Sequence, residues 1–114
     1  MANGEVELKV TLIPNEILLE VVAERARQER LKAEGRFRFS CADVEMSNGE
    51  RLAVLGEEFG EVARAFLETQ RLANDRHNKD LRAELIQVAA VAVAWVEGLD
   101  AKARMIVAFR ETRA

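Results

Sequence analysis

The sequence is almost free of the residues that end helices, which restricts it to few kinds of fold. Its 114 residues include one proline and six glycines. Alanine, glutamate, arginine and leucine, which favour helices, occur throughout the chain. Hydrophobic residues make up 49% and charged residues 32%, which is enough apolar material for one modest core. We therefore predict a single all-α domain that covers residues 1–114.

Apolar residues at helical spacing predict where the first helix lies. It is expected over residues 15–34, with Pro14 in its first turn and Gly35 as its C-terminal stop. Before it, residues 6–13 alternate between apolar and polar side chains. We expect residues 1–14 to form an extended N-terminal arm with a short strand-like segment.

The second helix is expected over residues 50–72, after a connector of mixed character at residues 36–46. Ser47 and Glu50 have the spacing of a capping box, which marks a helix start. The expected core stripe of this helix consists of Leu52, Leu55, Phe59, Val62 and Phe66.

A polar break at residues 74–78 precedes a third helix, expected over residues 79–97. This helix is apolar nearly all round, so other elements should cover it on most sides. Gly98 is expected to interrupt it, and Asp100 to cap a final helix over residues 101–112. The pattern predicts a four-helix bundle, or a three-helix core with a terminal helix, completed by oligomerisation.

Charge and cysteine content exclude several functional classes. The net charge is −3, from 17 basic and 20 acidic residues without a basic block, so binding to duplex nucleic acid is not expected. Cys41 is the only cysteine and His77 the only histidine, which argues against a disulfide, a zinc site or a serine or cysteine nucleophile with a histidine base. The longest apolar stretch, residues 85–96, is too short to span a bilayer, and the N-terminus lacks a signal-peptide pattern. We expect a cytoplasmic protein without a membrane partner.

Three glutamates, Glu57, Glu58 and Glu61, lie within five residues on the expected second helix. Residues three or four apart share a helix face, so these carboxylates can converge, and Glu58 falls at the edge of the apolar stripe. Like charges at this spacing repel, and a half-buried carboxylate is costly to desolvate. A divalent cation would remove both penalties; the alternative is an acidic face in contact with water.

A second pair of oxygen-bearing side chains, Glu84 and Gln87, is three residues apart on the expected third helix. Glu84 projects on the same side as Val88 and Trp95, where a carboxylate needs a partner. Oxygen ligands suit hard cations such as Mg²⁺ or Mn²⁺, and antiparallel packing of the two helices would bring the two groups together. Such a site could grip a phosphate chain and activate a water molecule, with one glutamate accepting its proton.

The paired motifs resemble those of the MazG-like, all-α nucleoside triphosphate pyrophosphohydrolases. The resemblance lies in EEFGE at 57–61 and ELIQ at 84–87, which match the EExxE and ExxD motifs of that family. VAAVAVAWVE at 88–97 is similar to the third helix of phage and actinobacterial members, and the segment at 22–28 is similar to the ERxRQ segment of their first helix. The resemblance covers roughly residues 17–100.

This resemblance implies a bundle-like all-α fold, a homodimer or homotetramer, and Mg²⁺-dependent hydrolysis of a nucleoside triphosphate to monophosphate and pyrophosphate. The implied metal ligands are Glu58, Glu61, Glu84 and Gln87, and the implied catalytic residues are Glu57, Glu58 and Glu61. Gln87 stands where the family has an aspartate, and a neutral amide oxygen attracts Mg²⁺ less than a carboxylate does. The competing interpretation is therefore a helical module with little or no catalysis that binds a nucleotide or a protein.

Nucleotide-binding residues are expected from two places in the chain. Arg25 and Gln28 could reach the nucleotide from the first helix, or they could make helix–helix hydrogen bonds. Lys79 lies near the start of the third helix, where a phosphate could be met, or it could face solvent.

Overall fold

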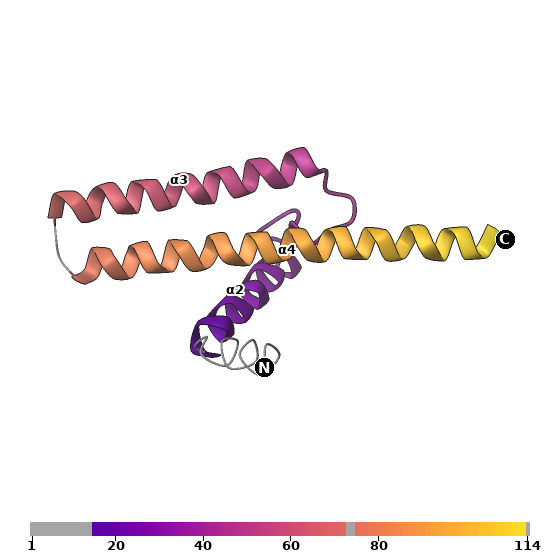
Figure 1. Cartoon of the computed structure of the whole chain (residues 1–114), viewed down its shortest axis with the longest axis horizontal. Helices are drawn as coiled ribbons and strands as arrows, with labels where there is room; N and C mark the ends of the chain where they lie inside the picture. The colour runs from indigo at the N-terminus through magenta and orange to yellow at the C-terminus, as the bar shows by residue number, and fades with distance from the viewer. Residues whose placement is uncertain (1–14, 73–74, 114) are drawn as a thin grey trace, which may run out of the picture.

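The computed structural model describes residues 15–72 and 75–113 (Figure 1). The prediction of an all-helical chain is confirmed, because these residues form helices and no strand. The three helices are α2 (Asn15–Ala33), α3 (Asn48–Leu72) and α4 (Asp75–Arg113). The expected N-terminal arm, residues 1–14, lies outside the described residues.

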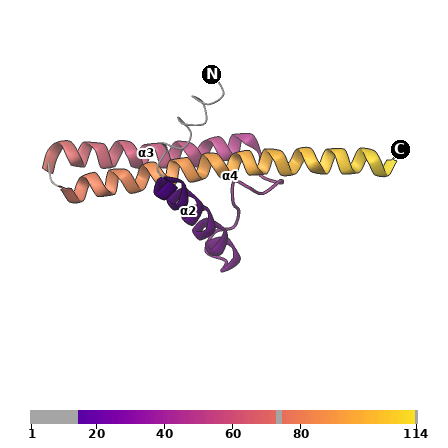
Figure 2. The ribbon, with the colours of Figure 1, turned by 60° about the horizontal axis from the view of Figure 1, so that its bottom comes forward.

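The helix α4 is the element around which the others are placed. It packs against both α3 and α2. Figures 1 and 2 show α3 and α4 side by side in opposite directions, with α2 crossing α4 on another side. With 39 residues α4 is about 58 Å long, and its C-terminal part extends alone beyond α3 (Figure 1). None of the helices in the described part of the chain is long and apolar enough to cross a membrane.

The end of α2 confirms the role expected for Gly35. This glycine has a φ of 79°, a left-handed conformation that favours glycine. Its N–H donates to the Lys32 carbonyl at 3.0 Å, and the Arg36 N–H donates to the Leu31 carbonyl at 2.9 Å. These two hydrogen bonds form a Schellman motif, which satisfies carbonyls that the helix end leaves without partners.

The start of α3 confirms the predicted capping box. The Glu50 N–H donates to the Ser47 hydroxyl at 3.1 Å, and the Ser47 N–H donates to the Glu50 carboxylate at 3.1 Å. The polar break after α3 is shorter than the expected residues 74–78, since α4 already begins at Asp75.

The prediction that Gly98 interrupts the third helix is wrong, and residues 101–112 continue α4 instead of forming a separate helix. A glycine inside a helix costs roughly 1 kcal/mol relative to alanine. Here the missing side chain makes room for close packing. A Cβ atom on Gly98 would lie 2.7 Å from the Cys41 carbonyl oxygen and would collide with the Arg51 guanidinium group. Asp100 accordingly lies inside α4 and not at a helix start.

The core lies where the connector, α3 and α4 meet. Its buried residues are Cys41, Val91 and Ala94, packed against by Ala42, Met46, Val54 and Leu55. The stripe expected on the second helix is only partly right, since Leu55 and Val62 are half-buried. Leu52, Phe59 and Phe66 are 60%, 69% and 48% exposed.

Small residues explain which faces meet. Ala65 of α3 and Ala90 and Ala94 of α4 are buried, so the contact uses short side chains and leaves large ones on the flanks. The expectation that the third helix is covered on most sides is also wrong. Leu85 and Val96 of α4 are 51% and 56% exposed in the single chain.

Arg51 fixes the connector to α3, a role that the sequence did not reveal. Its side chain is buried, at 1% exposure. The guanidinium donates to the Cys41 carbonyl at 2.8 Å, to the Asn48 side chain at 3.1 Å and to the Asp43 carbonyl. Because its donors meet backbone carbonyls, the buried charge is satisfied and the connector is held against α3.

Candidate functional site

Glu58 of α3 and Glu84 of α4 form the centre of the candidate site. Both residues are half-buried. Each has a buried carboxylate oxygen, Oε2, to which no donor from the described part of the chain is hydrogen-bonded. Burial raises the pKa of Glu58, and the charge of Glu84 raises this pKa further. The charge of Glu84 thus acts on Glu58, and a bound cation would relieve this repulsion. The two residues line different pockets, Glu58 the apolar pocket and Glu84 the acidic cavity described below.

The helix α2 adds a carboxylate that the sequence did not single out. The charge of Glu24 also raises the pKa of Glu58, so three helices bring acidic groups toward one region. The Glu24 carboxylate accepts two hydrogen bonds from Arg27, both at 2.9 Å. The only available signal was its place at the head of the ERxRQ-like segment on α2.

Glu61 lies one turn beyond Glu58 and lines a cavity of about 230 Å³ between α3 and α4 together with Glu84. Two further acidic residues, Glu68 and Asp80, line the same cavity and were not predicted. Glu61 forms an ion pair with Arg64, its neighbour three residues on. Its carboxylate thus already has a cationic partner, although one at the surface, where such pairs contribute little.

Glu57, the first residue of the EExxE motif, is exposed to solvent. Its charge is the last of the four carboxylate charges that raise the pKa of Glu58. Of the three glutamates expected to converge, Glu57 is therefore the one whose side chain lies on the solvent side of α3.

Gln87 and Lys79 line a groove between α2 and α4, with a volume of about 470 Å³. The other charged residues of this groove are Glu20, Glu24, Arg27, Arg30 and Arg82. Arg82 forms a two-pronged ion pair with Glu20, one contact of which is 2.8 Å long. The groove therefore places basic side chains beside Glu20 and Glu24, whereas Glu58 and Glu84 do not line it. Gln87 lies one helical turn beyond Glu84 on α4.

Arg25, expected to bind the nucleotide, makes helix–helix interactions. Its buried guanidinium donates to both carboxylate oxygens of Glu97 on α4, at 3.0 and 2.7 Å, and to the Gln28 side chain at 3.0 Å. These contacts lower the pKa of the Glu97 carboxyl, chiefly through the hydrogen bond from Arg25. Gln28 also lines a pocket, described next, so the two residues have different surroundings.

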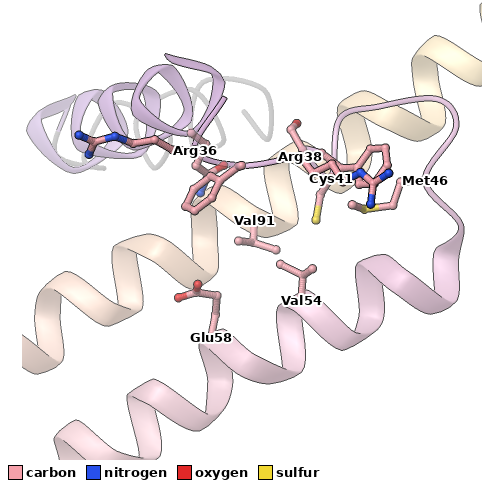
Figure 3. A pocket seen from close by; sticks show the side chains of 11 residues that line it. Arg36, Arg38, Cys41, Met46, Val54, Glu58 and Val91 are labelled. Atoms are coloured by element: carbon pink, nitrogen blue, oxygen red, sulfur yellow. The ribbon is translucent and has the colours of Figure 1, made fainter. Parts of the chain in front are cut away.

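An apolar pocket of about 370 Å³ opens beside Glu58 (Figure 3). The connector contributes most of its lining, including Phe37 and Phe39, for which the sequence predicts only a link between helices. Val54 and Val91 point toward one another across it, and Glu58 lies at one end (Figure 3). The alternation of arginine and phenylalanine over residues 36–39 was the available signal.

The donor set fits a hard cation in one specific way. Over residues 15–72 and 75–113, no three histidine, cysteine or acidic side chains are arranged as a ready-made metal cluster. Mg²⁺, however, commonly binds through one or two carboxylates and takes its remaining ligands from water and substrate phosphates. The partnerless oxygens of Glu58 and Glu84 supply that minimum.

Comparison with protein-family models, with curated protein sequences and with solved structures finds no match to this chain.

Proposed function

We propose that this protein is an Mg²⁺-dependent nucleotide pyrophosphohydrolase, which converts a nucleoside triphosphate to a monophosphate and pyrophosphate. One observation carries the proposal: Glu58 and Glu84 each hold a buried carboxylate oxygen without a hydrogen-bond partner in the described chain. Their mutual repulsion makes the metal-free site unfavourable and a cation-bound site favourable. The resemblance of the EEFGE and ELIQ segments to the MazG-like family agrees with this proposal.

The surroundings of the two glutamates suit a triphosphate. The groove that contains Arg27, Arg30 and Lys79 would attract the phosphate chain. The apolar pocket beside Glu58 has a volume within the range of small-molecule sites and offers aromatic side chains to a base. A nucleotide placed with its base in the pocket and its phosphates toward the groove would pass the carboxylates.

In this proposal Glu58 and Glu84 would hold Mg²⁺. Glu61, from the cavity between α3 and α4, and the Gln87 amide oxygen, from the groove between α2 and α4, would extend the ligand set. When bound, Mg²⁺ would polarise the attacked phosphorus and lower the pKa of a coordinated water. A carboxylate not used as a ligand would accept the water proton. Glu57 is the first choice for that role by resemblance, although its exposed position requires the substrate to lie on the solvent side of α3.

A pyrophosphate-release assay with a panel of nucleoside triphosphates tests the proposal. We expect turnover with Mg²⁺ or Mn²⁺, and its loss in Glu58→Gln and Glu84→Gln. Glu111→Gln, an exposed change at the far end of α4, is the matched control and should leave turnover intact. Absence of turnover with every triphosphate at millimolar Mg²⁺ and Mn²⁺ would contradict the proposal that the protein is an enzyme.

A second candidate is a nucleotide- or protein-binding module without catalysis. Gln87 favours it, because this residue replaces the carboxylate of the resembled motif. The ion pairs of Arg27 with Glu24 and of Arg82 with Glu20 favour it too, since they neutralise part of the groove. Gln87→Asp separates the candidates: a gain in Mg²⁺ affinity and turnover marks an enzyme weakened at this position, and no effect favours binding alone.

We also propose that the protein acts in the cytoplasm as a homo-oligomer and that a second copy completes a four-helix arrangement. Large apolar residues at the surface of α3 support self-association. Phe59, Phe66 and Leu67 are 69%, 48% and 61% exposed. Exposed apolar side chains in such number commonly mark an interface.

A further inference from the structure

A continuous apolar stripe on α4 faces neither α3 nor α2. Its large residues Leu85, Val96 and Leu99 are 51%, 56% and 43% exposed, and Ile106 is 45% exposed. By contrast, Ala94, on the side of α4 that meets the core, is 1% exposed. The stripe therefore has no partner within residues 15–72 and 75–113.

The stripe follows the heptad spacing of a coiled coil. Steps of four and three residues alternate from Leu85 to Ile106 through positions 89, 92, 96, 99 and 103, and each of these positions is apolar. This spacing keeps one seam facing a partner helix along its whole length. The seam is about 32 Å long, which is most of a bundle helix.

Small and large residues are distributed unevenly along the seam. Ala89, Ala92 and Ala103 are small, whereas Leu85, Val96 and Leu99 are large. We infer that a second copy of this chain packs its α4 antiparallel on this seam, with Ala92 opposite the partner's Val96. The same register sets Ala89 opposite the partner's Leu99 and Ala103 opposite the partner's Leu85, so a small residue meets a large one at these three steps. Ile106 then lies opposite the partner's Arg82, whose methylene groups can cover it.

A parallel pair would pack worse. Each residue would then face its own copy, so three alanine pairs would leave gaps. Arg82 and Arg110 continue the same spacing at either end. In a parallel pair Arg110 would also face its own copy, whereas Arg82 is already paired with Glu20 of α2. Between Arg82 and Arg110 no seam position is charged, so the seam offers no charge with which a different protein could pair. A surface that complements itself under a two-fold rotation selects a second copy.

This inference rests on the self-association proposed above, which it places on α4 and not on the exposed residues of α3, and it does not rest on the hydrolase activity. Light scattering of the full chain should give a dimer, and Val96→Glu should give a monomer with unchanged helical circular dichroism. Met105→Glu is the matched control, because Met105 lies off the seam on the same helix and is 57% exposed. It should remain a dimer.

Cysteine cross-linking tests the register. In a Cys41→Ala background, Ala92→Cys and Val96→Cys chains carrying tags of different length should form a disulfide-linked pair when mixed, and neither should do so alone. Cross-linking of Ala92→Cys alone would overturn the antiparallel register. A dimer that survives Val96→Glu would overturn the seam while leaving self-association standing. A wild-type monomer at every concentration would overturn both, and none of these results depends on pyrophosphate release.

Discussion

Replacing Glu58 by glutamine isolates the cost of its unpaired carboxylate. In the metal-free protein we expect Glu58→Gln to be more stable than the wild type at neutral pH. The amide keeps the shape of the side chain and removes both a charge that is costly to bury and the repulsion from Glu84. Glu57→Gln, an exposed change next to it, should leave stability unchanged.

The expected gain can be bounded. A buried acceptor without a partner costs about 1–3 kcal/mol. Because Glu58 is only half-buried, the gain should lie at the lower end, about 1 kcal/mol. For a chain of this length that corresponds to a rise in Tm of roughly 4 °C.

The gain should depend on pH with a fixed sign. Burial and neighbouring carboxylates raise the pKa of Glu58 in the folded state. A raised pKa means that folding takes up a proton, so the contribution of Glu58 to wild-type stability is present in acid and lost as the pH rises through its folded pKa. Glutamine is neutral throughout, so the advantage of Glu58→Gln should appear above that pH and vanish below it.

Thermal unfolding of both proteins between pH 4 and 8, with and without Mg²⁺, is the assay. Mg²⁺ should raise the Tm of the wild type by mass action and raise that of Glu58→Gln less or not at all. A variant that is less stable than the wild type without metal, or a gain that does not change with pH, would refute the account of this site.

Three other changes test the packing. Gly98→Ala should lower the free energy of unfolding by about 2 kcal/mol in urea titrations, since its Cβ would collide with Arg51. Unchanged stability would show that the Arg51 side chain can move aside. Arg25→Met should cost about 1 kcal/mol at pH 7, and the loss should shrink in acid, because the lowered pKa of Glu97 makes this stabilisation disappear as the pH falls through it. Ser47→Ala should lower stability by about 1 kcal/mol through loss of the α3 cap, measured by thermal unfolding.

Local signals were read correctly from the sequence where the chain alone decides the conformation. The stop at Gly35 and the cap at Ser47 depend on backbone groups within a few residues, and both are present. The prediction for Gly98 is wrong because the role of this glycine depends on Arg51 and Cys41, which are far away in the sequence. Helix propensity predicts a break at such a glycine, whereas tertiary contacts keep the helix continuous.

The face of a helix that packs inward could be predicted only in part. Apolar periodicity selected Phe59 and Phe66, whereas the contact between α3 and α4 uses buried alanines. The candidate site shows the same division. Spacing selects Glu58 and Glu84, and the charge of Glu84 raises the pKa of Glu58, although the two residues line different pockets. Glu24 comes from α2, and no spacing rule relates residues on helices that cross.

Because α4 is uninterrupted, one rigid helix lines three separate cavities. Within two turns it supplies Glu84 to the acidic cavity, Gln87 to the basic groove and Val91 to the apolar pocket. Because the Arg51 guanidinium group fills the space beside Gly98, the helix has no hinge at this glycine. Sliding it by a single residue, about 1.5 Å, would therefore displace all three linings together.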